Sequence, residues 1–141
     1  MKALFMAVFL GLAVFGLTAC GSAQKTTTTS STNQQAASAY HKISAQEAKA
    51  MMDKGNVTVV DVRTPAEYAD GHIPQAILLP LDEVDQKAES VLKNKKDILL
   101  VYCRSGRRSK AASDKLVEKG YQQVFDFGGI NDWPYAVTKG K

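Results

Sequence analysis

Apolar and polar positions divide the chain into three regions. Residues 3–17 are almost entirely apolar, residues 21–39 are mostly small and polar, and from residue 40 onward short apolar blocks alternate with mixed segments. The middle region has too few apolar side chains to bury a core. We therefore expect one globular domain over residues 40–141, preceded by a separate N-terminal segment.

Four apolar blocks in the domain predict strands, because they are short and rich in β-branched or aliphatic residues. They are residues 57–62, 76–80, 97–103 and 122–127. The third block is continuously apolar, which is typical of a central strand in a parallel sheet.

Helix signals separate the strand blocks. Ser44 and Glu47 form one capping-box pattern, and Thr64 and Glu67 form a second with Pro65 at the first helical position. The predicted helices cover residues 44–55, 64–70, 81–94 and 108–120. Strands that alternate with helices predict a three-layer α/β domain, with a mostly parallel central sheet flanked by helices.

The N-terminal segment has the layout of a secretory signal over residues 1–19, with a lysine, an apolar run and small residues. Leu17-Thr18-Ala19-Cys20 resembles the lipobox of bacterial lipoproteins. The resemblance implies a lipidated Cys20, residues 20–39 as a flexible tether, and a membrane-anchored protein of the cell envelope outside the cytoplasm. An ordinary signal with a cysteine near its cleavage site, or a short hydrophobic anchor, are the alternatives.

Charge excludes one class of partner. The chain has a net charge of +4, but Lys2 and Lys25 precede the domain, which holds 16 Lys and Arg against 14 Asp and Glu. This excess is too small for a nucleic-acid-binding surface. Positive charge is nevertheless concentrated in one place, since three of the domain's four arginines lie within residues 104–108.

That basic stretch follows Cys103, the only cysteine besides Cys20. Ligands bind at the carboxyl ends of parallel strands, and Cys103 ends a predicted strand just before a helix. Backbone N–H groups of residues 104–108 can form an anion-binding nest there, with freedom supplied by Gly106. Such surroundings favour a reactive thiolate. The alternative is an inert buried cysteine beside a solvated helix start.

Three stretches in register resemble the single-domain rhodanese-like sulfurtransferases: "CRSGRRS" at 103–109, "DVRTPAEYADGHIP" at 61–74 and "GGINDW" at 128–133. The resemblance covers residues 40–138. It departs at Gln75, where the family usually has glycine, which concerns a turn more than the chemistry.

The resemblance implies a thiosulfate sulfurtransferase with Cys103 as nucleophile. The cysteine takes a sulfane sulfur from a small anionic donor, holds it as a persulfide and passes it to cyanide or a thiol. The persulfide cradle comprises Arg104, Ser105, Gly106, Arg107 and Arg108. Arg104 and Arg108 are the best candidates to hold the donor. We expect no cofactor, no metal and a monomer.

Nearby residues have more ordinary interpretations. Asp61 and Arg63 could orient the loop, but a structural ion pair is the preferred role. Glu67 is first a capping residue, His72 fixes a turn and Trp133 packs in the core.

Two rival functions remain. The first is phosphatase or arsenate reductase activity. Dual-specificity phosphatases of related fold place five residues between cysteine and arginine, whereas four separate Cys103 from Arg108, and the shorter loop favours sulfur. The domain could also be a tethered persulfide carrier or a binding module, which would need the same loop.

Overall fold

The computed structural model describes residues 38–140. The predicted signal peptide, Cys20 and the tether up to residue 37 lie outside the described residues. No helix in the described part is long and apolar enough to cross a membrane.

Five strands form one parallel sheet in the order β1-β5-β4-β2-β3. The strands are β1 (Tyr40–Lys42), β2 (Val57–Asp61), β3 (Ile77–Leu78), β4 (Ile98–Cys103) and β5 (Gln123–Gly129). The helices are α1 (Ala45–Lys54), α2 (Pro65–Asp70), α3 (Val84–Val91) and α4 (Arg107–Glu118), with 3-10 turns η1 (Leu81–Glu83) and η2 (Ile130–Asp132). The predicted α/β class, the parallel sheet and the central place of β4 are confirmed.

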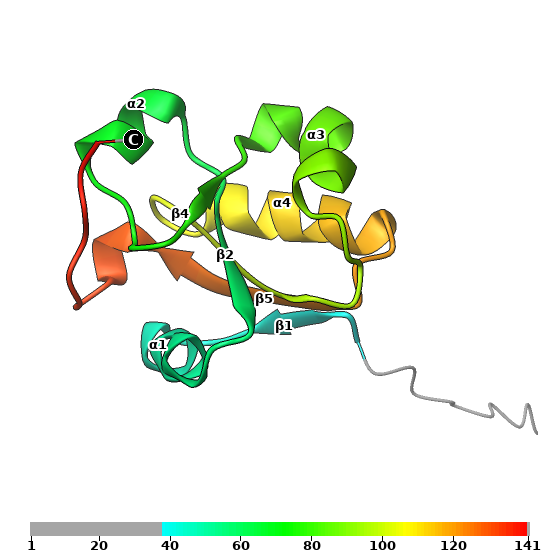
Figure 1. Cartoon of the computed structure of the whole chain (residues 1–141), viewed down its shortest axis with the longest axis horizontal. Helices are drawn as coiled ribbons and strands as arrows, with labels where there is room; N and C mark the ends of the chain where they lie inside the picture. Colours follow the sequence, from blue (N-terminus) through cyan, green and yellow to red (C-terminus); the bar gives the residue numbers. More distant parts are fainter. Residues whose placement is uncertain (1–37, 141) are drawn as a thin grey trace, which may run out of the picture. The chain divides into compact units, whose positions relative to one another are not determined.

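Helices cover both faces of the sheet, with α1 on one face and α3 and α4 on the other (Figure 1). Successive side chains of β4 point to opposite faces of the sheet and pack in both cores. Leu99, Val101 and Cys103 join the core beneath α3 and α4, while Leu100 and Tyr102 join the core on the side of α1. Cys103 is therefore directed toward the first turn of α4.

Both predicted capping boxes are present. The Ser44 hydroxyl accepts a hydrogen bond from the Glu47 N–H, and the Thr64 hydroxyl accepts one from the Glu67 N–H. Each glutamate accepts in return from the N–H of its cap residue, so donors left unpaired at a helix start are satisfied.

The predicted strand at 76–80 is shorter than expected, and the predicted helix at 81–94 is divided. Only Ile77 and Leu78 pair with β2. The Leu79 N–H makes the last hydrogen bond of this pairing, to the Asp61 carbonyl, and Pro80, which follows, has no N–H to continue the strand. Beyond Pro80 the chain makes the 3-10 turn η1 before α3 begins at Val84.

Strand β1 was not predicted. Its three residues show no alternation of apolar and polar side chains, and its partner β5 begins far along the chain at Gln123. Its position at the edge of the sheet depends on tertiary pairing alone.

Gln75 has a φ of 66°, in the left-handed region that glycine adopts without strain. The resemblance marked this position as the one where glycine is usual. The departure therefore places a side chain on a turn whose backbone still follows the glycine-like conformation.

Candidate active site

Cys103 ends β4 and is buried at 1% exposure. Its thiol is free. The Gly106 N–H donates a hydrogen bond to the Cys103 Sγ at 3.1 Å. The sulfur therefore lies against the backbone of the basic loop, as the sequence predicts for a nest.

Hydrogen bonds decide the ionisation of this thiol. Burial raises the pKa of Cys103, but the N–H groups of Ser109, Gly106 and Ser105 outweigh burial and hold the pKa below its ordinary value. Thiolate is the nucleophilic form of cysteine. Ser109 lies outside the predicted cradle of residues 104–108. It is the third residue of α4, where N–H groups have no partner within the helix, and that position was the available signal.

Two glycines let the loop approach β5 closely. Gly106, with φ of 101°, is the N-cap residue of α4 and packs against the backbone of Gly128. A Cβ on Gly129 would lie 2.2 Å from the Arg104 carbonyl oxygen, so no side chain fits there. The Gly-Gly stretch in "GGINDW" is therefore the surface on which the cysteine loop rests.

The three arginines of the loop have different surroundings. Arg104 and Arg107 are exposed, and within residues 38–140 no hydrogen bond or ion pair engages either side chain. Arg108 is about half-buried and donates to both carboxylate oxygens of Glu67 at 2.8 and 2.7 Å.

Glu67 is thus more than a helix cap. The Arg108 guanidinium and, after it, the Thr64 cap lower the pKa of Glu67 to about 2 despite partial burial. In turn Glu67 raises the pKa of Arg108. The capping pattern was visible in the sequence, but the pairing of Glu67 with Arg108 of the cysteine loop was not, because it joins residues on two separate helices.

Asp61 and Arg63 form a second, buried pair. Arg63 Nη2 lies 2.6 Å from Asp61 Oδ2 and donates also to the Gly71 carbonyl at 2.7 Å. The Tyr102 hydroxyl, one residue before Cys103, donates to the same Asp61 oxygen at 2.7 Å. Burial and then the Asp61 charge raise the pKa of Tyr102. The preferred structural ion pair is present, and it braces β4 rather than contacting residues 104–108.

His72 and Trp133 take up the ordinary surroundings expected of them. The His72 ring stacks on Tyr68 with its Nδ1 2.9 Å from the Tyr68 carbonyl oxygen, and its backbone pairs with Thr138. Trp133 is buried beside Phe127. Among residues 38–140, no cluster of three or more His, Cys, Asp or Glu could hold a metal ion.

A hollow of about 520 Å³ adjoins the loop. Arg63, Thr64, Leu81 and Arg108 are among the residues that line it. Arg108 belongs to the loop and also lines the hollow. A small anion in the hollow would therefore lie beside the Arg108 guanidinium.

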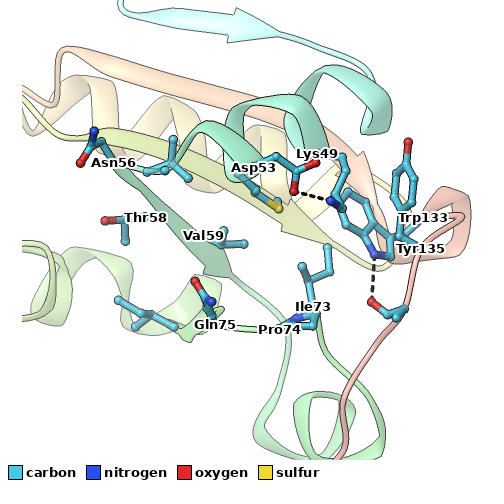
Figure 2. A pocket seen from close by; sticks show the side chains of 15 residues that line it. Lys49, Asp53, Asn56, Thr58, Val59, Ile73, Pro74, Gln75, Trp133 and Tyr135 are labelled. Carbon is cyan, nitrogen blue, oxygen red and sulfur yellow. Dashed lines mark hydrogen bonds and ion pairs between the residues drawn. The ribbon is translucent and has the colours of Figure 1, made fainter.

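A second hollow, of about 420 Å³, lies on the side of α1 and holds no residue of the cysteine loop (Figure 2). Lys49 and Asp53 of α1, Gln75, Trp133 and Tyr135 surround it.

Known proteins resemble this chain in sequence and in fold. Residues 44–135 match the family model described as "Rhodanese-like domain". The chain is 38% identical over 81 residues to the thiosulfate sulfurtransferase PspE of Escherichia coli (strain K12), covering 57% of this chain and 78% of that protein. It is 33% identical over 99 residues to the putative sulfur carrier protein YrkF of Bacillus subtilis (strain 168), covering 69% of this chain and about half, 52%, of that protein.

A solved structure of a rhodanese-related protein has the same fold. The rhodanese-related protein of Thermoplasma volcanium superimposes with a TM-score of 0.63 at 31% identity, covering 70% of this chain and 98% of that one. The match to the family model spans the cysteine loop, the capping box at Thr64 and the Gly-Gly stretch that supports the loop. The chain therefore belongs to the rhodanese-like domain family, whose sulfurtransferase members support sulfur transfer as its general chemistry.

Proposed function

We propose that the protein transfers a sulfane sulfur from a small anionic donor such as thiosulfate to cyanide or a thiol, through a persulfide on Cys103. The single observation that carries the proposal is the thiol itself, held by several backbone N–H groups that lower its pKa within a basic loop.

The reaction has two balanced steps. The Cys103 thiolate attacks the outer sulfur of thiosulfate, a Cys–S–S bond forms, and sulfite leaves with the electron pair of the broken S–S bond. Cyanide or a thiolate then attacks the terminal sulfur, and the electron pair of the broken bond returns to Cys103 as thiolate.

Backbone N–H groups would stabilise the anionic sulfur in both steps. The donors are those of Ser105, Gly106 and Ser109, which need no reorganisation because the loop and the start of α4 hold them in place. We assign donor binding to Arg104, which is free in the described residues, and to Arg108, which must share its charge with Glu67.

Phosphatase or arsenate reductase chemistry is less favoured. Only four residues lie between Cys103 and Arg108, and the Gly106 N–H already reaches the sulfur at 3.1 Å. This compact loop suits one sulfur atom better than a tetrahedral oxyanion.

A persulfide carrier is the second candidate, supported by the similarity to a relative named a putative sulfur carrier. A carrier loads once and discharges poorly to small acceptors, whereas an enzyme cycles.

The test is the intact mass of the purified protein before and after thiosulfate, with the Cys103→Ser variant alongside. We expect a gain of one sulfur atom that cyanide removes and that the variant does not show. Repeated cycles with cyanide would establish an enzyme, and a single discharge would favour the carrier. Hydrolysis of an aryl phosphate without sulfur uptake would contradict the proposal.

We also propose that lipid on Cys20 anchors the protein to a cell-envelope membrane outside the cytoplasm, on a periplasmic face or at the cell surface. The lipobox and the polar stretch after it support this. The full chain should partition with membranes, and the Cys20→Ala variant should not be processed to the lipidated form; an unmodified mature N-terminus in the full chain would contradict the anchor.

A further inference from the structure

A buried carboxylate lies behind the cysteine loop. Asp126 of β5 is 1% exposed. Its Oδ1 accepts hydrogen bonds from the Ser109 hydroxyl at 2.7 Å and from the Gly128 N–H at 2.9 Å. No step of the proposed reaction uses this carboxylate.

The other carboxylate oxygen faces β1. Asp126 Oδ2 accepts a hydrogen bond from the Tyr40 hydroxyl at 3.1 Å and lies 3.3 Å from Lys42 Nζ. Lys42 is 55% exposed and is the only cation within ion-pair distance of Asp126 among residues 38–140. Taking a carboxylate out of water is costly, so four polar contacts on one buried aspartate indicate a defined task.

Both residues held by Oδ1 belong to the support of the thiolate. The Ser109 N–H is one of the donors that lower the pKa of Cys103. Gly128 packs directly against Gly106, whose N–H bonds to the sulfur. Asp126 is the nearest, and the only charged, of three acceptors around the Ser109 hydroxyl; the others are the carbonyls of Gly106 and Gly128.

We propose that Asp126 is a positioning residue of the sulfur site: its Oδ1 holds Ser109 and Gly128 so that the N–H groups of the loop aim at Cys103, and Tyr40 and Lys42 of β1 hold Asp126. The inference rests on the proposed function in one respect only, namely that the cysteine loop is the site of sulfur transfer.

The anchor on β1 lies outside the family match. Tyr40 and Lys42 precede residue 44, where that match begins. Burial, and then the charge and hydrogen bond of Asp126, raise the pKa of Tyr40 to about 12, so its hydroxyl remains a donor at neutral pH. Lys110 of α4 also lies over the Tyr40 ring, 4.7 Å from its centroid. Strand β1 thereby becomes part of the site's support.

The experiment measures the rate of Cys103 alkylation by iodoacetamide from pH 5 to pH 10, which reports the thiol pKa without any sulfur donor. Asp126→Ala removes the acceptor, and the double variant Tyr40→Phe with Lys42→Met removes its anchor. Asp126→Asn is the matched control, because it keeps an oxygen acceptor but loses the charge. Lys49→Met removes a distant lysine on α1. Thermal unfolding of every variant shows that it is folded.

We expect Asp126→Ala to raise the Cys103 pKa by about one unit, which moves the pH profile of alkylation upward by the same amount. The β1 double variant should move the profile upward by about half a unit, while Asp126→Asn and Lys49→Met stay within about 0.3 unit of the parent protein. If Asp126→Ala does not fold, the β1 double variant decides.

Unchanged profiles in folded Asp126→Ala and in the β1 double variant would overturn the inference, and so would an Asp126→Asn profile shifted as far as that of Asp126→Ala. A parent protein that takes no sulfur from thiosulfate would contradict the proposed function but leave this comparison intact. Sulfur uptake with unmoved profiles would overturn the positioning role alone.

Discussion

Two arginine–carboxylate pairs flank the cysteine loop, and they differ in burial. Arg63 and Asp61 are almost fully buried, with side chains 6% and 0% exposed, whereas Arg108 and Glu67 are 30% and 28% exposed. Both pairs have two-pronged geometry, with shortest separations of 2.6 and 2.7 Å. Geometry alone therefore does not distinguish their roles.

Burial does. The buried pair has further partners inside the protein, namely the Tyr102 hydroxyl on Asp61 and the Gly71 carbonyl on Arg63. If an anion from solvent replaced Asp61 as the partner of Arg63, the buried Asp61 carboxylate would be left without a cation. The partly exposed pair borders a hollow, and water can compensate Glu67 when Arg108 turns to a substrate. One arginine belongs to the scaffold and the other is available to the proposed donor.

The largest effect that separates the pairs should come from Arg63→Met. This variant leaves the Asp61 charge buried without its cation, so we expect a loss of about 3–5 kcal/mol in the free energy of unfolding. Urea unfolding measures it. Arg108→Gln is the control and should lose less than about 1 kcal/mol. A larger loss in Arg108→Gln than in Arg63→Met would reverse the assignment of scaffold and site.

An intermediate effect should appear in the kinetics of Arg108→Gln. We expect its KM for thiosulfate to rise about tenfold, which corresponds to ~1.4 kcal/mol, because a charged donor to the anion is lost. Steady-state assays with cyanide as acceptor measure it. Arg107→Gln is the matched control, since that exposed side chain has no partner in the described residues. Equal KM changes in the two variants would mean that only the general charge of the loop matters.

The smallest effect concerns acid stability through Glu67. Since its pKa falls from 4.5 to about 2 on folding, the pair's contribution is complete above about pH 4.5 and is lost as the pH falls toward 2. For a partly exposed pair we expect less than about 1 kcal/mol. The unfolding free energy of Glu67→Gln should therefore approach that of the parent protein between pH 4.5 and pH 2.

Glu67→Gln also frees Arg108. Its KM for thiosulfate should fall a few-fold at neutral pH, because the donor no longer competes with a carboxylate. A gap in stability between the variant and the parent that stays constant down to pH 2 would show that the ion pair is not the origin of the contribution.

The sequence alone determined the features that depend on neighbours along the chain. Capping boxes at Ser44 and Thr64, the apolar run of β4 and the thiol at its end follow local rules of propensity and hydrogen bonding, and each is present as predicted. The loop of residues 103–108 also follows, because strand, glycine and helix start are consecutive.

Tertiary structure decided what joins distant residues. The sequence does not reveal that β1 pairs with β5, that Glu67 binds Arg108, or that Asp126 supports Ser109. A charged residue gives the same local signal whether it faces water or a partner on another element. Only the packing of β1, β5, α2 and α4 brings these partners within hydrogen-bond distance, which is why the place of Cys103 in its loop could be predicted and the contacts that support the loop could not.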